Sequence, residues 1–235
     1  MNLAASSVPL RPCAPAACRP LRLLGSGVAA ALDPLASSAI DARLGLPPGT
    51  VERRSGVRSR GVETRRSAAA LGADAARRAL ASAGLGLHEI DAVIAASATM
   101  DQAMPCNAAL IHRELHLGQP GPSERGMPAF DIGASCLGFV VALDTASALI
   151  AAGRYRRVLV VAADIASCGL DWDQLEASAI FGDGAAAVVV DAGRHADHID
   201  RDGRAAPGLL AAAFATHSEG AHFCEIRGGG SRYHP

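Results

Sequence analysis

One cysteine of this 235-residue chain occupies a position suited to a nucleophile. The segment FDIGASCLGFVVALDTASALIAAG (130–153) passes from a short apolar stretch through Gly-Ala-Ser-Cys into a long, almost uncharged stretch, which predicts a strand, a turn and a buried helix. Cys136 would then lie in the first helical turn, where unpaired N–H groups and the helix dipole favour a negative thiolate. A thiolate there is a candidate nucleophile, although a cysteine that packs as a small hydrophobe fits the same position.

Two further motifs, one around Ser135 and one rich in glycine, partly match those of serine hydrolases and of dinucleotide-binding proteins. Ser135 precedes the cysteine, but the hydrolase motif G-x-S-x-G requires glycine at position 137, where the chain has Leu137. The sequence GSGVAA (25–30) resembles a dinucleotide-binding fingerprint. No strand that ends in an acidic residue follows at the required distance, so nucleotide binding there is not favoured.

The histidines allow a metal site in principle. His112 and His116 stand one helical turn apart, a spacing that can hold a metal ion. The H-E-x-x-H order is absent, and a solvated helix face explains the pair more simply. His195 and His198 lie in a polar stretch that we interpret as a loop. We therefore predict no metal and no bound cofactor.

A segment rich in arginine, VERRSGVRSRGVETRR (51–66), contains two glycines. It is either an ordinary solvated surface or a loop that presents guanidinium groups to a phosphate. The residues alone leave both interpretations open.

The elements that must position these residues alternate along the chain. Helical spacing predicts helices within 35–46, 67–85 and 103–118, besides the one that follows Cys136. Apolar and β-branched stretches predict strands within 21–30, 89–99, 128–134, 156–164, 177–190 and 208–220. In the first of these, LRLLGSGVAA (21–30), we expect the strand to lead into a glycine turn. This alternation predicts an α/β protein with helices over both faces of a sheet.

Composition excludes several classes of function. The 22 basic and 23 acidic residues give a net charge of −1, so no general attraction to nucleic acid or to an anionic membrane is expected. No apolar run reaches the length of a membrane span. The six cysteines include no C-x-x-C pair, which favours a reducing, cytoplasmic setting. We expect residues 1–20, with their four prolines, to be a disordered extension and residues 21–235 to form one domain.

Four segments together resemble the β-ketoacyl-acyl carrier protein synthase III family of the thiolase superfamily. They are RRSGVRSR (53–60), PAFDIGASCLGF (128–139), VLVVAAD (158–164) and IFGDGAAAVVV (180–190). Their order and spacing also fit, over residues 21–191. The resemblance implies the N-terminal half of a thiolase-like fold, with a mixed, largely parallel sheet and helices on both faces.

The resemblance also implies a function. Enzymes of this family transfer an acyl group from coenzyme A to the cysteine, here Cys136, and condense it with malonyl-acyl carrier protein in fatty acid or related biosynthesis. The backbone N–H of the cysteine contributes to an oxyanion hole. Arg54 matches the arginine that contacts the coenzyme A nucleotide, and Met104 matches a residue that lines the acyl pocket across a homodimer interface. Coenzyme A thioester is a substrate, so no cofactor is implied.

The sequence also departs from the family pattern. The tryptophan that stacks on adenine would fall near Thr50, and a second nucleotide-contacting arginine near Leu175, so an acyl donor on a carrier protein is an alternative to coenzyme A. The family's later histidine and asparagine have no counterpart in the 99 residues after Cys136, so we expect a truncated chain in which condensation fails. The alternative function is a non-catalytic partner, or carrier-binding subunit, of a full-length synthase.

Overall fold

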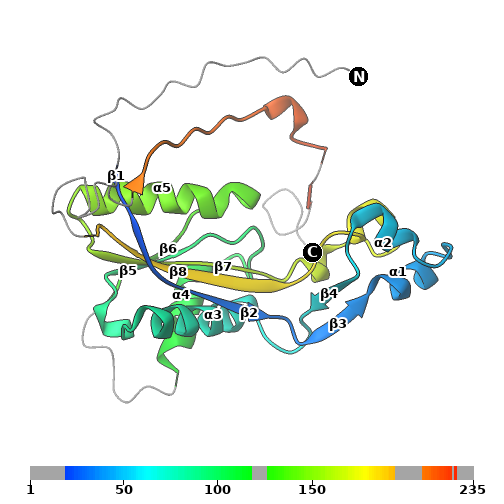
Figure 1. The fold of residues 1–235 in the computed structure, drawn as a ribbon, viewed down its shortest axis with the longest axis horizontal. Coiled ribbons are helices and arrows are strands. Elements are labelled where there is room, and N and C mark those ends of the chain that lie inside the picture. The colour runs from blue at the N-terminus through cyan, green and yellow to red at the C-terminus, as the bar shows by residue number, and fades with distance from the viewer. Residues whose placement is uncertain (1–18, 118–125, 194–207, 224, 227–235) are drawn as a thin grey trace, which may run out of the picture.

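The computed structural model describes residues 19–117, 126–193, 208–223 and 225–226 (Figure 1). At its centre lies a five-stranded sheet of order β2-β8-β7-β5-β6. The bounds of these strands are Arg22–Ala30 (β2), Ala92–Ala95 (β5), Ala129–Asp131 (β6), Arg157–Asp164 (β7) and Gly184–Asp191 (β8). Strand β5 is parallel to β6 and β7, whereas β8 is antiparallel to both of its neighbours. The predicted mixed α/β sheet is therefore confirmed, with β8 making it less parallel than expected.

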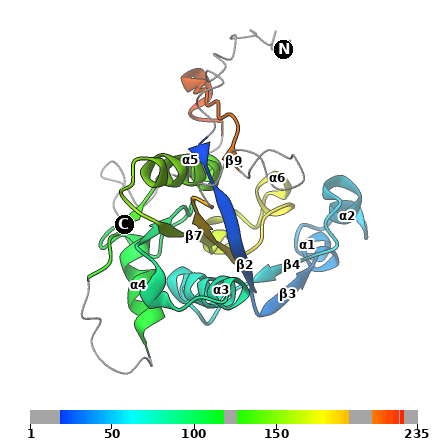
Figure 2. The ribbon, with the colours of Figure 1, turned by 60° about the vertical axis from the view of Figure 1, so that its left-hand side comes forward.

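Helices cover both faces of this sheet (Figures 1 and 2). Helices α3 (Ala68–Ala83) and α4 (Asn107–His116) pack on one face, and α5 (Gly138–Ala151) packs on the other. The two apolar clusters differ in composition, because the α3 side is built largely of alanine and the α5 side of valine and isoleucine. Two buried layers on one sheet are typical of α/β domains.

The carboxyl ends of four strands meet at one edge of the sheet. Strands β5, β6 and β7 run in the same direction, and β2 shares it because both β2 and β7 are antiparallel to β8. Loops that leave these strands therefore start side by side. We call this edge the loop edge.

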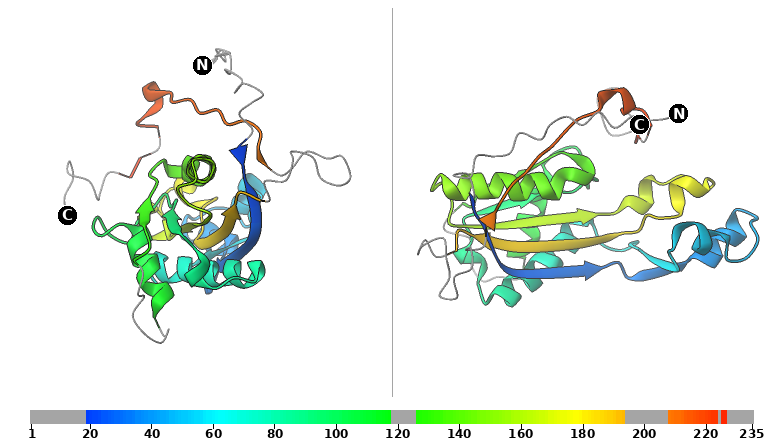
Figure 3. Two further views of the ribbon diagram at one scale, coloured as in Figure 1. Left: turned by 90° about the vertical axis from the view of Figure 1, so that its left-hand side faces the viewer. Right: turned by 45° about the horizontal axis from the view of Figure 1, so that its top comes forward.

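A smaller unit projects beyond the loop edge (Figure 3). It consists of the hairpin β3 (Asp33–Ala36) with β4 (Ser59–Val62), and of helices α1 (Ser37–Arg43) and α2 (Thr50–Ser55). Its own apolar cluster centres on Ile40, Val51 and Ala179. We call this unit, residues 33–62, the cap.

The remaining elements are short. They are β1 (Arg19–Pro20), β9 (Gly208–Leu209), α6 (Leu175–Ser178) and the single turns η2 (Leu87–Glu89), η3 (Ser135–Leu137), η4 (Ala166–Gly169) and η5 (Ser218–Gly220). Strand β9 pairs with β1, so the expected strand over 208–220 is confined to two residues. Of the extension expected at residues 1–20, residues 1–18 lie outside the described residues, and Arg19 and Pro20 form β1. Within the described segments, no helix is both long and apolar enough to cross a bilayer.

Two glycines of β2 permit the close approach of α3. A Cβ added to Gly25 would lie 2.5 Å from the backbone N of Ala83, and one added to Gly27 would lie 2.3 Å from the carbonyl O of Ala75. The stretch GSGVAA therefore belongs to a strand that packs against a helix, and the glycine turn expected there is wrong. The alanines of α3 complete the contact from the other side.

We predict that Gly27→Val destabilises the protein by about 3 kcal/mol, because its side chain would overlap the backbone of α3. Urea denaturation followed by circular dichroism measures the loss. Ser26→Val, at the exposed neighbouring position of the same strand, is the control and should change stability by less than about 1 kcal/mol. Equal stability of the two variants would contradict the packing argument.

Candidate active site

Cys136 lies at the loop edge, in the turn that joins β6 to α5. Strand β6 ends at Asp131, η3 spans Ser135–Leu137, and α5 begins at Gly138. The expected strand, turn and helix are thus confirmed. The Cys136 side chain is exposed and free of any disulfide, which answers the alternative that it packs as a buried hydrophobe.

The backbone around the cysteine is unusual at two positions. Ser135 has φ +46°, in the left-handed region that non-glycine residues rarely adopt. Gly138 lies so close to β5 that an added Cβ would be 2.9 Å from the carbonyl O of Ala96. A strained turn and a close helix start together hold Cys136 out from the sheet. Ser135 is part of this turn. The hydrolase motif G-x-S-x-G does not occur here, because Leu137 stands where its second glycine would be.

Asp131 fixes the start of the neighbouring helix. Its carboxylate accepts hydrogen bonds from the backbone N–H groups of Asn107 (2.9 Å) and Ala108 (2.7 Å), the first two residues of α4. A carboxylate at a helix N-terminus satisfies unpaired donors and complements the helix dipole. The last residue of β6, five positions before Cys136, therefore joins β6 to α4.

Asp164 plays the equivalent part at the end of β7. Its Oδ1 accepts hydrogen bonds from the N–H groups of Ala98 (2.8 Å) and Thr99 (2.6 Å) and from the Thr99 hydroxyl (2.9 Å). These donors belong to the segment that follows β5. We call residues 96–106 the Met104 loop.

Met104 lies on this loop, at the same edge of the sheet as Cys136. The register pairs Ala95 of β5 with Asp131 of β6, so the Met104 loop and the Cys136 turn leave adjacent strands. Met104 is 83% exposed, and among the described residues no hydrogen bond joins it to Cys136. The structure thus places both residues at one edge without bringing the side chains together.

Arg54 lies in the cap, in the last turn of α2, and its side chain is exposed. Within the part of the chain that the structure describes, it has no hydrogen bond or ion pair. Its neighbour Arg53 donates to the carbonyl O of Pro48 (3.1 Å) and to the hydroxyl of Thr50 (3.1 Å). The arginine segment is therefore not one loop, because it forms α2 and β4.

Arg60, in β4, is buried and links the cap to the residue that follows α6. Its Nη2 donates to Ser37 Oγ (3.1 Å) and to the carbonyl O of Ala179 (2.6 Å). Burial without a carboxylate partner lowers the pKa of this guanidinium below its ordinary value. An arginine in this position is structural and is not available to a phosphate.

Asp183, of the F-G-D-G motif, ties the cap to the loop after β7. Its carboxylate accepts from Glu63 N–H (2.7 Å), Ser167 N–H (2.8 Å) and Ser167 Oγ (2.6 Å). All three donors are buried or partly buried, and Asp183 itself is buried. A carboxylate with this many fixed donors is a joint between segments.

Glu63 continues this joint. Burial would raise the pKa of its carboxyl, but hydrogen bonds from the Arg66 side chain and from the N–H groups of Arg65 and Arg66 outweigh burial and lower the pKa to about 2. The Arg66 guanidinium lies 2.6 Å from Glu63 Oε2 and also pairs with Asp74 of α3. The segment between the cap and α3 is thus held by charge-assisted bonds.

His112 and His116 contact each other on α4. Their Nε2 atoms are 3.2 Å apart and the ring centroids 4.5 Å. Burial, and secondarily the neighbouring His116, lowers the pKa of His112. Among the described residues no group of three or more metal-ligating side chains occurs. His195 and His198 lie outside the described residues.

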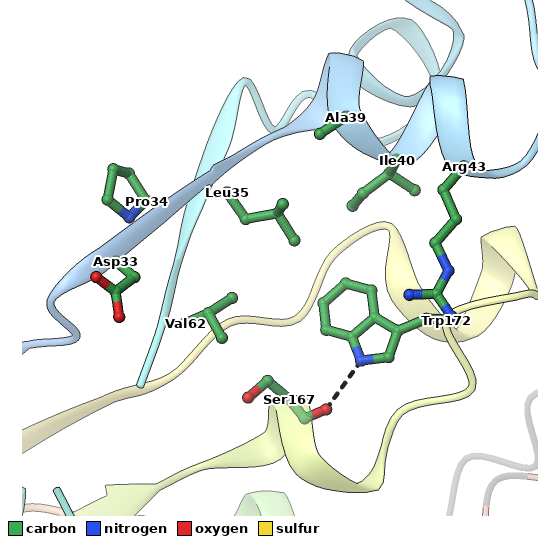
Figure 4. A pocket seen from close by; sticks show the side chains of 9 residues that line it. All are labelled: Asp33, Pro34, Leu35, Ala39, Ile40, Arg43, Val62, Ser167 and Trp172. Carbon is green, nitrogen blue, oxygen red and sulfur yellow. Dashed lines mark hydrogen bonds between the residues drawn. The ribbon is translucent and has the colours of Figure 1, made fainter. Parts of the chain in front are cut away.

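A cavity of about 340 Å³ lies between the cap and the loop after β7 (Figure 4). Pro34, Leu35 and Ile40 form much of its apolar wall. The indole of Trp172 faces it, anchored by a 3.1 Å hydrogen bond from Nε1 to the carbonyl O of Ser167. Its lining includes none of the three predicted site residues, so this cavity is separate from the Cys136 turn.

The described structure and sequence match known proteins over part of their length. A family model described as 3-oxoacyl-[acyl-carrier-protein (ACP)] synthase III matches residues 130–203. A β-ketoacyl-[acyl-carrier-protein] synthase III from Bordetella petrii is 41% identical over 143 residues, which cover 61% of this chain and 38% of that protein.

Solved structures agree in fold. The 3-oxoacyl-(acyl carrier protein) synthase III of Pseudomonas aeruginosa PAO1 superposes with a TM-score of 0.68 at 34% identity, over 76% of this chain and 52% of that one. The synthase III of Aquifex aeolicus VF5 has a TM-score of 0.68 at 28% identity, over 79% of this chain and 63% of that one. The chain therefore spans about two fifths of the curated relative and a little over half of these solved chains.

The sheet order, the two helical layers and the cysteine at the loop edge are those of a thiolase-like condensing enzyme, over the part of that fold that the chain spans. Within this class, the chain is similar to the 3-oxoacyl-[acyl-carrier-protein] synthase III family over the residues that these matches cover. The predicted fold class and the predicted resemblance to this family are confirmed.

Sequence reasoning missed the roles of several polar residues at the loop edge. Asp131 and Asp164 each end a strand, and an aspartate directly after an apolar strand was a signal available in the sequence. Asp183 had no such signal, because its partners lie on segments distant in sequence. The partners of the Asn107 side chain lie only six and eight residues away, but these bonds form only once the loop between them is folded.

We predict that Glu63→Gln reduces the loss of stability in acid. The pKa of Glu63 is about 2 in the folded protein against an ordinary 4.5, so its carboxylate stabilises the fold above about pH 4.5. That contribution is lost as the pH falls through the folded pKa. The variant should be less stable than wild type at pH 7, and the difference should shrink between pH 4.5 and 2.

Urea unfolding at pH 7, 4.5 and 3 measures this effect. Glu176→Gln is the control, because Glu176 on α6 is exposed and forms no hydrogen bond or ion pair with any described residue. A constant difference between Glu63→Gln and wild type at all three pH values would refute the linkage.

Proposed function

We propose that the protein is a β-ketoacyl-acyl carrier protein synthase III-type acyltransferase with Cys136 as its nucleophile. The observation that carries the proposal is the exposed thiol in a strained turn at the start of α5, within the segment that the family model matches. In the loading step, Sγ of Cys136 attacks the thioester carbonyl carbon, the new C–S bond forms, and the thiol of coenzyme A leaves.

The donor side of the proposal depends on the cap. Arg54 is exposed, and no described residue neutralises its guanidinium, so it is available to a phosphate of a coenzyme A donor. The buried Thr50 occupies the place of the family's adenine-stacking tryptophan, which keeps an acyl-carrier protein as the alternative donor. Met104 is proposed to line the acyl pocket, and the Cys136 N–H to stabilise the oxyanion.

We also propose the condensation step and the assembly of the protein into a homodimer. Acyl-Cys136 would condense with malonyl-acyl carrier protein and release carbon dioxide. We propose that the residues from Leu21 onward form one thiolase-like domain that pairs as a homodimer in the cytoplasm. Neither a nucleic acid nor a membrane is among the proposed partners.

A second candidate is a non-catalytic partner or carrier-binding subunit of a full-length synthase. Exposed apolar side chains favour it, because Leu137 and Val140, three residues apart in the Cys136 segment, are 48% and 50% exposed. Apolar side chains that gather at a surface mark an interface with another protein. The two candidates differ in whether Cys136 accepts an acyl group.

We predict that the protein forms an acyl adduct when it is mixed with acetyl- or longer acyl-coenzyme A, and that Cys136→Ser abolishes the adduct. Intact-protein mass spectrometry detects it. Cys168→Ser is a matched control, because Cys168 is also exposed and free and should not affect the adduct. An adduct that survives Cys136→Ser, or none in the wild type, would favour the non-catalytic candidate.

We predict that Arg54→Ala raises the KM of loading from acyl-coenzyme A by about tenfold while kcat changes little. The contact between Arg54 and the donor phosphate would stabilise the bound donor and the transition state equally, so its loss weakens binding without slowing the chemical step. The acyl thioester of N-acetylcysteamine, which lacks the nucleotide, serves as the control donor and should be loaded equally by both proteins. An equal loss with both donors would assign Arg54 to the stability of the cap instead.

A further inference from the structure

The side chain of Asn107 closes the Met104 loop on itself. It is 1% exposed, its Oδ1 accepts a hydrogen bond from the N–H of Asp101 (3.1 Å), and its Nδ2 donates to the carbonyl O of Thr99 (3.2 Å). A neutral amide offers a donor and an acceptor on one short side chain. Both bonds reach back six to eight residues, so they fix the shape of the loop.

Three carboxylates hold the closed loop in place. Asp164 of β7 binds its first turn through Ala98 and Thr99, and Asp131 of β6 binds the N–H of Asn107. Asp101, inside the loop, accepts from the first two N–H groups of α3, at 2.7 and 2.9 Å. The loop is therefore attached to two strands and two helices, and Asn107 lies where these attachments meet.

This attached loop begins beside the nucleophile. The carbonyl O of Ala96, its first residue, lies 2.9 Å from the position that a Cβ of Gly138 would occupy, two residues after Cys136. Met104 stands near the far end of the loop with its side chain in solvent, and its carbonyl accepts a hydrogen bond from the Gln102 side chain. The loop is thus fixed at its base and presents Met104 outward.

We propose that Asn107 is a positioning residue that sets where Met104 stands at the proposed homodimer interface, and so selects the length of the acyl chain that the thiol across that interface accepts. This role rests on the proposed function and deepens it. Asn107 touches neither the thiol nor the acyl group; it acts through the loop. Removal of its amide leaves the Asp101 N–H and the Thr99 carbonyl without their buried partners, so the loop loosens at the base of Met104.

The first experiment measures the loop directly in the full chain. Hydrogen–deuterium exchange of peptides covering residues 96–106 is compared in wild type, Asn107→Asp and Asn107→Leu. Asn107→Leu keeps most of the volume without hydrogen bonds, and Asn107→Asp replaces the donor to Thr99 with an acceptor. We expect at least tenfold faster exchange in the loop. Ser147→Ala, which removes the hydrogen bond from a buried serine to the carbonyl O of Asp144 in α5, on the other face of the sheet, is the control and should leave the loop unchanged.

The second experiment measures selectivity. Loading rates of Cys136 are determined with acetyl-, hexanoyl- and decanoyl-coenzyme A, and the ratios of kcat/KM between donors are compared. We expect each Asn107 variant to shift these ratios severalfold. A merely structural role would lower all three rates by one common factor, and that outcome overturns the proposal.

Met104→Ala supplies the test that does not depend on a stable Asn107 variant, because Met104 is exposed and its removal should not unfold the chain. The proposal requires that Met104→Ala alone shifts the chain-length ratios and that adding Asn107→Asp then shifts them no further. Unchanged ratios in Met104→Ala overturn it. A wild type that loads no donor overturns the proposed function and the selection of acyl length, while the exchange rates still decide whether Asn107 holds the loop.

Discussion

Carboxylates that accept several N–H groups at once hold together the edge of the sheet on which the site depends. Asp131 and Asp164 end two parallel strands and bind the segments that start next to them, and Asp101 binds the start of α3. Each such bond is charge-assisted and satisfies a donor that no regular element would pair. Hydrogen bonds to a charged group contribute about 1.5–3 kcal/mol each. The loop after β5 is therefore ordered by side chains at the ends of β6 and β7, the two strands that pair with β5.

The same edge needs close backbone contacts that only small residues permit. Gly138 lets α5 begin against the carbonyl O of Ala96, and Gly25 and Gly27 let α3 lie against β2 on the other face. With both helical layers close, the sheet has little freedom to shift beneath the turn that bears Cys136. The left-handed conformation of Ser135 is kept because β6 before it and α5 after it are both fixed.

Much of this architecture was predictable because its signals are local. Apolar runs such as 156–164 and 177–190, and the spacing of alanines in 67–85, predict strands and a helix without knowledge of their partners, and the turn around Cys136 follows from its flanks. The glycines of β2 were misassigned, because only the packed helix explains why a strand contains them. The division of the arginine segment into helix and strand also depends on a partner, since β4 forms only against β3. Asp183 was missed because its bonds join residues far apart in sequence, and Asn107 was missed because its bonds exist only once the loop after β5 is folded.

The joint around Asp183 bears on how the cap can act. Asp183 binds Glu63, which directly follows the cap, and Ser167 after β7, and Arg60 of the cap binds the carbonyl O of Ala179 in the segment between β7 and β8. These bonds couple the cap to the segment that leads into β8. Three fixed donors and burial make the F-G-D-G aspartate a structural joint. This joint holds the cap, and with it Arg54, at a fixed position relative to the loop edge, which the donor contact proposed for Arg54 requires.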